Sequence, residues 1–190
     1  MSGRSEIWLC RHGETEWSRD GRHTSRTDVP LTHEGLEEAR RLASRLSGVK
    51  FDLVLTSPLR RAADTAALAG FPDAIREPAA SEWDYGDYEG RTTAALREEV
   101  PGWTVWTHAP PGGETADQVG ARADRVIERV QDEAPTRALL FSHAHFMRVF
   151  AARWIDLPAT AGMRLLLDTG SVSVLAWERE VRAIKHWNTE

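Results

Sequence analysis

The sequence predicts an α/β fold with a mainly parallel central sheet flanked by helices. Short apolar runs alternate with segments of helical periodicity along the 190 residues, a pattern typical of helices packed on a parallel sheet. Three of these runs, at 7–10, 52–56 and 138–142, lead into histidines or arginines. Because the carboxyl ends of parallel strands lie along one edge of a sheet, we expect these side chains to meet there.

The first predicted strand, Ile7–Cys10, ends beside a residue pair suited to phosphate chemistry. Arg11 and His12 follow it directly, and Gly13 permits a sharp turn. A histidine at a strand end can act as a nucleophile or a base, and a neighbouring guanidinium can bind a phosphate oxygen. The pattern gains weight because similar residues follow two later strands.

The second predicted strand, 52–56, leads into a helix that brings two arginines to the same edge. We expect Ser57 as the N-cap of this helix and Pro58 at its first helical position. Arg60 and Arg61 then lie in the first turn. The role of Arg60, a phosphate ligand or a solvated helix residue, stays open at this point.

The third predicted strand, Ala138–Ser142, ends in His143, Ala144 and His145. His12, the arginine pair and His143 should therefore share one edge of the sheet. Scattered polar residues need no special explanation, but the convergence of three strand ends with phosphate-binding side chains indicates a functional site.

The other expected elements complete a single domain over residues 1–190. They are helices over 32–46, 58–69 (ended by Gly70), 93–99, 114–133 and 145–155, and a hairpin of strands over 171–177 and 181–187. Residues 70–113 are rich in proline, glycine, tryptophan and acids. We expect this part of the chain, called the lid segment below, to cover the sheet as loops and one short helix.

Composition limits the classes of partner. The net charge of −5 argues against nucleic acid, because a phosphate backbone needs a basic surface. The sequence contains neither an apolar run long enough to span a membrane nor a signal-peptide core, so no membrane partner and a cytoplasmic location are expected. The single cysteine, Cys10, excludes an intrachain disulfide and is expected to be a buried strand residue. The oligomeric state stays open, a homodimer included.

Several of these motifs together resemble the histidine phosphatase superfamily, also called phosphoglycerate-mutase-like. They are Arg11-His12-Gly13, the segment Ser57-x-Leu59-x-Arg61-Ala62, Glu82 before Tyr85-Gly86, and His143, in the expected order over nearly the whole chain. The segments 15–18, 27–32 and 82–90 resemble a branch that includes mutase-like acid phosphatases and sedoheptulose-bisphosphatases. The resemblance implies a phosphoglycerate-mutase-like fold.

The resemblance also implies a role for each motif residue. His12 is the nucleophile and forms a phosphohistidine that water hydrolyses. Arg11 and Arg61 bind the phosphoryl oxygens through their guanidinium groups. His143 stabilises the charge that develops in the transition state, and Glu82 is the general acid and base.

The assignment of Glu82 depends on its place in the pattern Glu-x-x-Tyr-Gly. Asp84, Asp87 and Glu89 lie close by in the sequence and are competing carboxylates for the same role. The pattern selects Glu82 among them.

Five further residues are expected to bind the substrate: Ser18, Thr24, Ser25, Trp106 and His145. Related mutases tend to have asparagine and glycine where Ser18 and Ser25 stand, which casts doubt on mutase activity. His145 also departs from the family, which commonly has glycine or asparagine there, and is expected to reshape the pocket rather than to catalyse.

The function expected from these residues is a metal-independent phosphatase, without a cofactor, that acts on a small phosphorylated metabolite. The alternatives are a phosphoglycerate mutase, although family mutases are usually longer, and a non-catalytic protein that binds a phosphorylated ligand. A zinc site built from His12, His143 and His145 is a further alternative, but the neighbouring arginines would oppose a dication.

Overall fold

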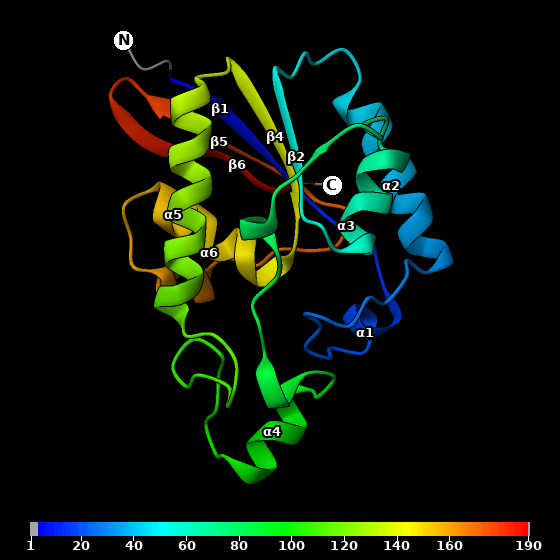
Figure 1. Cartoon of the computed structure of the whole chain (residues 1–190), viewed down its shortest axis with the longest axis vertical. Helices are drawn as coiled ribbons and strands as arrows, with labels where there is room; N and C mark the ends of the chain where they lie inside the picture. Colours follow the sequence, from blue (N-terminus) through cyan, green and yellow to red (C-terminus); the bar gives the residue numbers. More distant parts are fainter. Residues whose placement is uncertain (1–3, 190) are drawn as a thin grey trace.

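The structure, a computed structural model, describes residues 4–189 and has one mixed sheet with helices on both faces (Figure 1). In this part of the chain six strands are arranged in the order β3-β2-β4-β1-β5-β6. Their bounds are β1 Glu6–Arg11, β2 Leu53–Thr56, β3 Ile75–Arg76, β4 Arg137–Ser142, β5 Val172–Glu178 and β6 Val181–Thr189. The pairs from β3 to β1 are parallel, whereas β5 and β6 add an antiparallel hairpin at one edge. The predicted fold class is confirmed.

The helices form two layers. Their bounds are α1 Glu16–Arg19, α2 His33–Leu46, α3 Arg60–Leu68, α4 Thr93–Glu99, α5 Ala116–Glu133 and α6 Ala144–Trp154, with 3₁₀ turns at Pro78–Ala80, Gly86–Tyr88 and Ala159–Arg164. Helices α2 and α3 cover one face of the sheet, and α5 and α6 cover the other (Figure 1). Because side chains alternate along a strand, Ile7 and Leu9 of β1 pack towards α5 and α6. Cys10 packs towards α2 and α3, and burial raises the pKa of its thiol to about 12.

The start of α3 differs from the prediction. The helix begins at Arg60 with Leu59 at the N-cap position, so Ser57 is not its cap. The residue before a proline is pushed into extended backbone, and the Ser57 hydroxyl bonds to His143 instead. The first backbone N–H of the helix, at Arg60, donates to Asp28 Oδ1 at 2.9 Å, so a distant loop caps α3.

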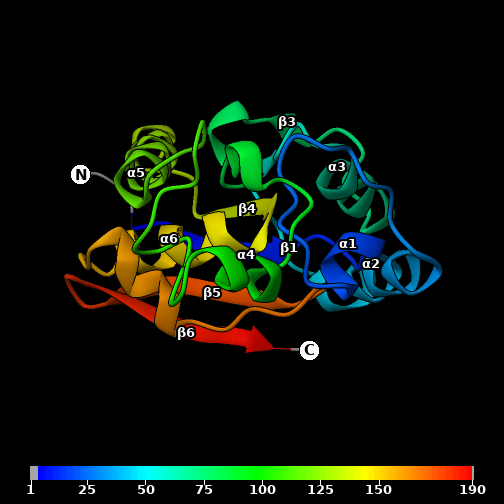
Figure 2. The same cartoon turned by 90° about the horizontal axis from the view of Figure 1, so that it is seen from below.

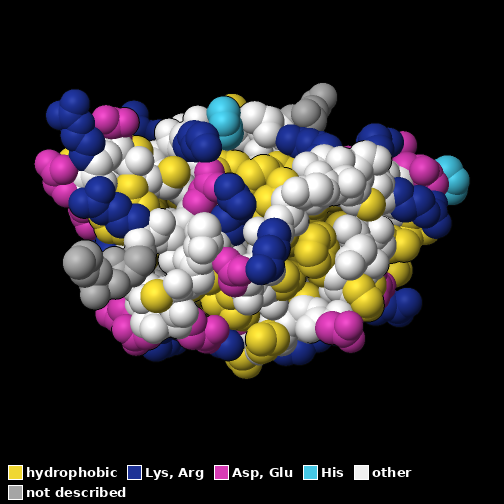
Figure 3. All heavy atoms as spheres, turned by 90° about the horizontal axis from the view of Figure 1, so that it is seen from above, with side chains coloured by type: hydrophobic (Ala, Val, Ile, Leu, Met, Phe, Trp, Pro, Cys, Tyr) yellow, Lys and Arg dark blue, Asp and Glu magenta, His cyan; other side chains and the backbone are white. Residues whose placement is uncertain are grey.

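The lid segment crosses the end of the sheet where the parallel strands finish. Seen from that end, α4 lies in front of the strands (Figure 2). The short helix over 93–99 was predicted, but the edge strand β3 was not. The opposite end of the molecule carries interspersed basic, acidic and apolar side chains (Figure 3). Among residues 4–189, no helix combines the length and the apolar character that crossing a membrane requires.

Candidate active site

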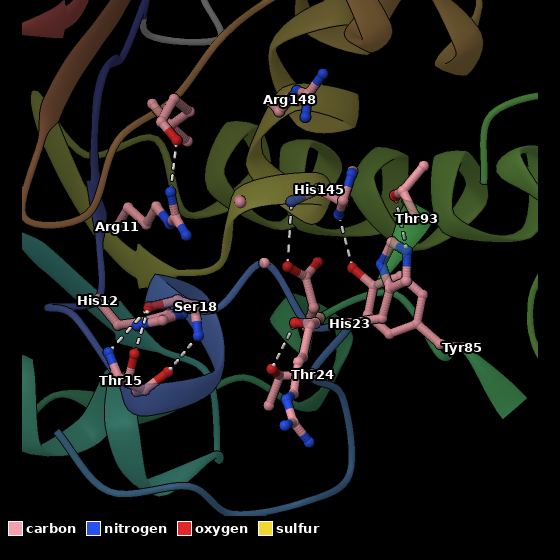
Figure 4. A pocket seen from close by; sticks show the side chains of 15 residues that line it. Arg11, His12, Thr15, Ser18, His23, Thr24, Tyr85, Thr93, His145 and Arg148 are labelled. Atoms are coloured by element: carbon pink, nitrogen blue, oxygen red, sulfur yellow. Dashed lines mark hydrogen bonds between the residues drawn. The ribbon is translucent and has the colours of Figure 1, made fainter. Parts of the chain in front are cut away.

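A cavity of about 260 Å³ opens at the carboxyl ends of β1 and β4 (Figure 4). Its walls come from the residues at the end of β1, the loop over 15–24, the lid segment, the start of α6 and the loop before β5. Arg11, His12 and Glu82 line it, as does His145. Of the strand-end residues expected to meet there, His12 lines the cavity, whereas Arg61, Arg60 and His143 are not part of its lining.

His12 has one ring nitrogen fixed and the other free. Its Nδ1 lies 2.7 Å from the carbonyl oxygen of Gly13, which places the ring proton on Nδ1 and leaves the Nε2 lone pair available. Burial lowers the pKa of His12 well below its usual value, and the charges of Arg61 and Arg11 lower it further. The ring is thus neutral at neutral pH, which is the form that can attack phosphorus.

Two glycines allow the loop after His12 to approach α2. The N–H of Gly13 donates to Thr65 Oγ1 of α3 at 3.1 Å. A Cβ on Gly13 would lie 2.2 Å from the carbonyl oxygen of Gly35, and a Cβ on Gly35 would lie 2.1 Å from that of Glu14. Both positions therefore require glycine. The predicted role of Gly13 in a tight turn did not include its partner Gly35.

Arg61 is 1% exposed, and the loop over 24–27 holds it in place. Its Nη1 donates to the carbonyl of Thr27, and its Nη2 donates to the carbonyls of Thr24 and Ser25, at 3.1–3.3 Å. These three bonds fix the plane of the guanidinium group beside His12, where its charge contributes to the lowered pKa of that ring.

Glu89 of the lid segment holds the same loop. Its carboxylate accepts the backbone N–H groups of Ser25 and Thr27 at 2.9–3.0 Å. The loop is therefore bound from two sides, by Arg61 at its carbonyls and by Glu89 at its N–H groups. Asp84 forms an ion pair with Arg26 of the same loop.

His143 lies at the N-cap of α6, with its ring centroid 5.1 Å from that of His12. Its Nε2 bonds to the Ser57 hydroxyl at 2.7 Å. Ser57 Oγ also accepts the N–H of Leu59, so the hydroxyl proton is free to point to Nε2. We therefore assign the proton of the neutral imidazole to Nδ1. Burial lowers the pKa of His143 well below its usual value, with Arg61 adding to the effect.

Three nitrogens around His12 are buried and have no hydrogen-bond partner among residues 4–189. They are Nε of Arg11, Nε of Arg61 and Nδ1 of His143. The only other side-chain atoms of that kind in the described chain are indole nitrogens of three tryptophans. A buried donor without an acceptor is costly, so the three donors beside one nucleophile indicate a place for the oxygens of an anion.

Glu82 is positioned by backbone groups from two elements. Its Oε1 accepts the N–H of Trp83 and of Phe146, and its Oε2 accepts that of His145 at 3.1 Å. The carboxylate therefore lies at the N-terminus of α6, on the cavity wall. Of the competing acids, Asp84 is bound to Arg26 and Asp87 and Glu89 lie outside the cavity lining.

Arg122 of α5 supports the chain around Glu82. Its guanidinium donates to the carbonyls of Ala79, Ser81 and Glu82 and pairs with Glu114 at 2.7 Å. The sequence reasoning did not single out Arg122, because nothing in the periodicity of α5 distinguishes it from the solvated arginines of that helix.

The five expected substrate-binding residues take different places. Ser18, Thr24 and His145 line the cavity, whereas Ser25 and Trp106 do not. The Ser18 hydroxyl is engaged in a capping box with Thr15 at the start of α1. Trp106 lies behind the lining and packs against His145, with ring centroids 5.2 Å apart.

The cavity also contains residues that the sequence did not predict. His23, Tyr85 and Arg148 line it, the last from the second turn of α6. A basic residue on an amphipathic helix is usually solvated, so the pattern alone could not identify Arg148. Within residues 4–189, no three His, Cys, Asp or Glu side chains are arranged to hold a metal ion.

Comparison with known proteins identifies the family. The sequence profile of the histidine phosphatase superfamily (branch 1) matches residues 7–190. An acid phosphatase of Mycobacterium tuberculosis is 42% identical over 181 residues, covering 94% of this chain and 89% of that protein. Sedoheptulose 1,7-bisphosphatase of Saccharomyces cerevisiae is 34% identical, covering 78% of this chain and 67% of that protein.

The solved structures agree with the sequence comparison. The structure of an open reading frame from Mycobacterium tuberculosis has a TM-score of 0.92 and 39% identity, with 97% of each chain covered. The resemblance seen in the motifs is confirmed over almost the whole length. The chain belongs to the histidine phosphatase superfamily.

Proposed function

We propose that this phosphatase is a phosphoric monoester hydrolase that acts on a small phosphorylated metabolite through a phosphohistidine, without a metal ion. The observation that carries the proposal is the set of three buried nitrogens beside His12 that have no partner in the described chain. Two belong to arginines and one to His143. A phosphoryl group bound at His12 Nε2 would offer each of them an acceptor oxygen.

In the first step His12 attacks the ester. The Nε2 lone pair forms a bond to phosphorus while the bond from phosphorus to the ester oxygen breaks. Arg11, Arg61 and His143 donate to the phosphoryl oxygens and stabilise the charge of the transition state. Glu82 gives its proton to the departing oxygen, which leaves as an alcohol.

In the second step water releases the phosphate. Glu82, now a carboxylate, takes a proton from the attacking water, whose oxygen bonds to phosphorus as the bond to Nε2 breaks. Inorganic phosphate, the neutral imidazole and protonated Glu82 result, so the cycle closes. The relatives named above, an acid phosphatase and a sedoheptulose bisphosphatase, support hydrolysis rather than transfer to a second substrate.

The covalent step is tested by trapping the intermediate. Brief mixing with a substrate labelled in its phosphate should place acid-labile, base-stable label on His12 of the unaltered protein. His12→Ala should abolish both label and turnover, while His108→Ala, at an exposed site in the lid segment, should retain them. Label on another residue, or turnover by the His12 variant, would contradict the proposal.

The role of Glu82 is tested through the leaving group. A sugar alkoxide needs a proton to leave, whereas nitrophenolate leaves without one. General acid catalysis contributes roughly 10²–10⁴ in rate, so Glu82→Gln should slow phosphoenzyme formation by that factor with a sugar phosphate. The burst of nitrophenol from p-nitrophenyl phosphate should slow much less.

Asp87→Asn is the matched control for Glu82→Gln, since Asp87 is an exposed acid of the same segment. It should show no dependence on the leaving group. If Glu82→Gln slows the two bursts equally, Glu82 only positions its neighbours and another group supplies the proton.

A further inference from the structure

The far wall of the cavity, beyond the reacting residues, contains a second cationic group. Figure 4 shows Arg148 and His145 on the side of the cavity away from His12. The Arg148 guanidinium lies over the Trp106 ring, 4.7 Å from its centroid. Its Nε donates to the carbonyl of Gly162 and its Nη2 to that of Met163, at 3.1 and 3.2 Å. The group is therefore held in one orientation before any ligand arrives.

Arg148 has no carboxylate within ion-pair distance in residues 4–189, although the charge of Glu82 acts on it across the cavity. Arg148 forms no ion pair in the described chain, and its Nη1 has no hydrogen-bond partner there, in contrast to arginines such as Arg122, Arg129 and Arg153. Burial lowers the pKa of the guanidinium, and the charge of Glu82 partly offsets this effect. A fixed cation that lines a cavity without a direct ion-pair partner is suited to binding an anion.

His145 adds a neutral donor on the same wall. Its Nδ1 lies 2.6 Å from the Tyr85 hydroxyl, and within the described residues that hydroxyl has no other partner. The hydroxyl therefore donates to Nδ1, which places the imidazole proton on Nε2. Burial keeps His145 neutral by lowering its pKa well below the usual value. The Nε2–H group is thus a neutral donor in the cavity that Arg148 also lines.

The charges of the residues that line the cavity also favour binding of a second anion. Three arginines line it, Arg11, Arg22 and Arg148, against one carboxylate, Glu82, whose oxygens already accept three backbone N–H groups. One phosphoryl group at His12 occupies Arg11 together with the buried Arg61. Arg148 and Arg22 remain for a different anion.

We propose that Arg148 and His145 bind a second anionic group of the substrate, so that the preferred substrates are phosphate esters that also carry another phosphate or a carboxylate. This inference rests on the proposed function, since it assumes that His12 receives the first phosphate. Both kinds of second group offer oxygens to a guanidinium fork. The test below separates the two.

Matched pairs of substrates test the second subsite. Glucose 1,6-bisphosphate is compared with glucose 6-phosphate, and 3-phosphoglycerate with glycerol 3-phosphate, by kcat/KM. A charge-assisted contact should give a preference of about 10- to 100-fold for one two-anion member, and the pair that shows it identifies phosphate or carboxylate. Arg148→Gln should remove most of that preference.

Arg182→Gln is the matched control, because Arg182 also lies over tryptophan rings but outside the cavity, at 5.0 Å from the Trp154 centroid. It should retain the preference. Arg148→Lys, which keeps the charge but not the fork, should give an intermediate value and serves as the second variant if the glutamine variant does not fold. Equal loss for both members of a pair, or no preference in the unaltered protein, overturns the subsite.

Calorimetric binding of the same four compounds keeps this inference separate from the proposed function. If the protein hydrolyses none of them, the proposed hydrolysis fails, and the affinities still decide the subsite. Tighter binding of a two-anion compound, about 10- to 100-fold and lost in Arg148→Gln, supports it. Equal affinities within each pair overturn it.

Discussion

Arg60 and Arg61 are neighbours in the first turn of α3, yet they lie in opposite environments. The side chain of Arg61 is buried and holds three carbonyls of the loop over 24–27. The side chain of Arg60 is 63% exposed and pairs with Asp64 on its own helix. Neither side chain is part of the cavity lining, but Arg61 is buried and its charge acts on His12, whereas Arg60 is a solvated helix residue.

Replacing each of these arginines should therefore have unequal effects on activity. Loss of one preorganised donor costs about 10²–10³ in kcat, and we expect a loss of that size for Arg61→Ala. Arg60→Ala, which removes an exposed ion pair, should stay within a few-fold of the unaltered protein. Steady-state kinetics with p-nitrophenyl phosphate measure both, and equal losses would show that the wrong arginine was assigned.

At the level of single residues, the sequence could place those side chains that directly follow a strand. His12 and His143 were identified because a buried apolar run precedes each of them, and parallel strands share an edge. Glu82 could be assigned only through the family resemblance, because no hydrophobic periodicity distinguishes it from the neighbouring acids. Arg148 and Tyr85 could not be found in this way, because their position depends on how α6 and the lid segment pack together.

At the level of elements, the hydrogen bonds between the lid segment and the loop over 24–27 should have a measurable effect on activity. Glu89 binds the backbone of this loop, and the loop in turn binds Arg61. Glu89→Ala should release the loop and lower kcat by about tenfold, since removing a charged acceptor costs roughly 1.5–3 kcal/mol. Glu89→Gln, which keeps one acceptor oxygen, should recover part of the activity.

Asp87→Ala is the control for these hydrogen bonds, because Asp87 is an exposed acid of the same segment, whereas the N–H groups of the loop donate to Glu89. Its kcat should not change. If Glu89→Ala lowers the melting temperature but leaves kcat intact, Glu89 stabilises the fold without positioning Arg61.

Elements were predicted well where a long periodic pattern exists. Helices α2, α4, α5 and α6 begin and end within two residues of their expected bounds. The strand β3 has two residues, too few for an alternating pattern to show. The predicted N-cap of α3, Ser57, was wrong for a different reason. The first N–H of the helix donates to Asp28, which lies in a loop 32 residues away, so no local sequence pattern contains this acceptor.

The molecule as a whole gathers its buried histidines at one place. Of the seven histidines in the chain, His12, His23 and His143 are buried and His145 is half-buried. Their ring centroids lie 5.1 Å apart for His12 and His143 and 6.1 Å apart for His23 and His145. Burial lowers the pKa of each; that of His23 falls to about 4. The remaining three, His33, His108 and His186, are exposed.

This arrangement predicts that the fold loses stability in mild acid. As the pH falls below about 6.5, each histidine takes up a proton in the unfolded chain, while these four rings, whose pKa values are lowered, stay neutral in the folded one. The unfolded state then binds more protons, so the free energy of unfolding decreases. The slope is at most about 1.4 kcal/mol per pH unit for each histidine, beginning near pH 6.5 and continuing for His23 to about pH 4.

The contribution of His23 to this pH dependence of stability can be measured separately. His23 contacts Tyr85 and Trp103 and is bonded to Thr93, so phenylalanine can fill its place among the rings. Urea titrations of His23→Phe in phosphate-free buffer should show a slope between pH 6 and 5 that is smaller by about 1 kcal/mol per pH unit. His33→Phe, at an exposed site, should leave the slope as it was. An unchanged slope in His23→Phe would mean that His23 takes up its proton while folded, and acid lability would then come from the rings of His12, His143 and His145 alone.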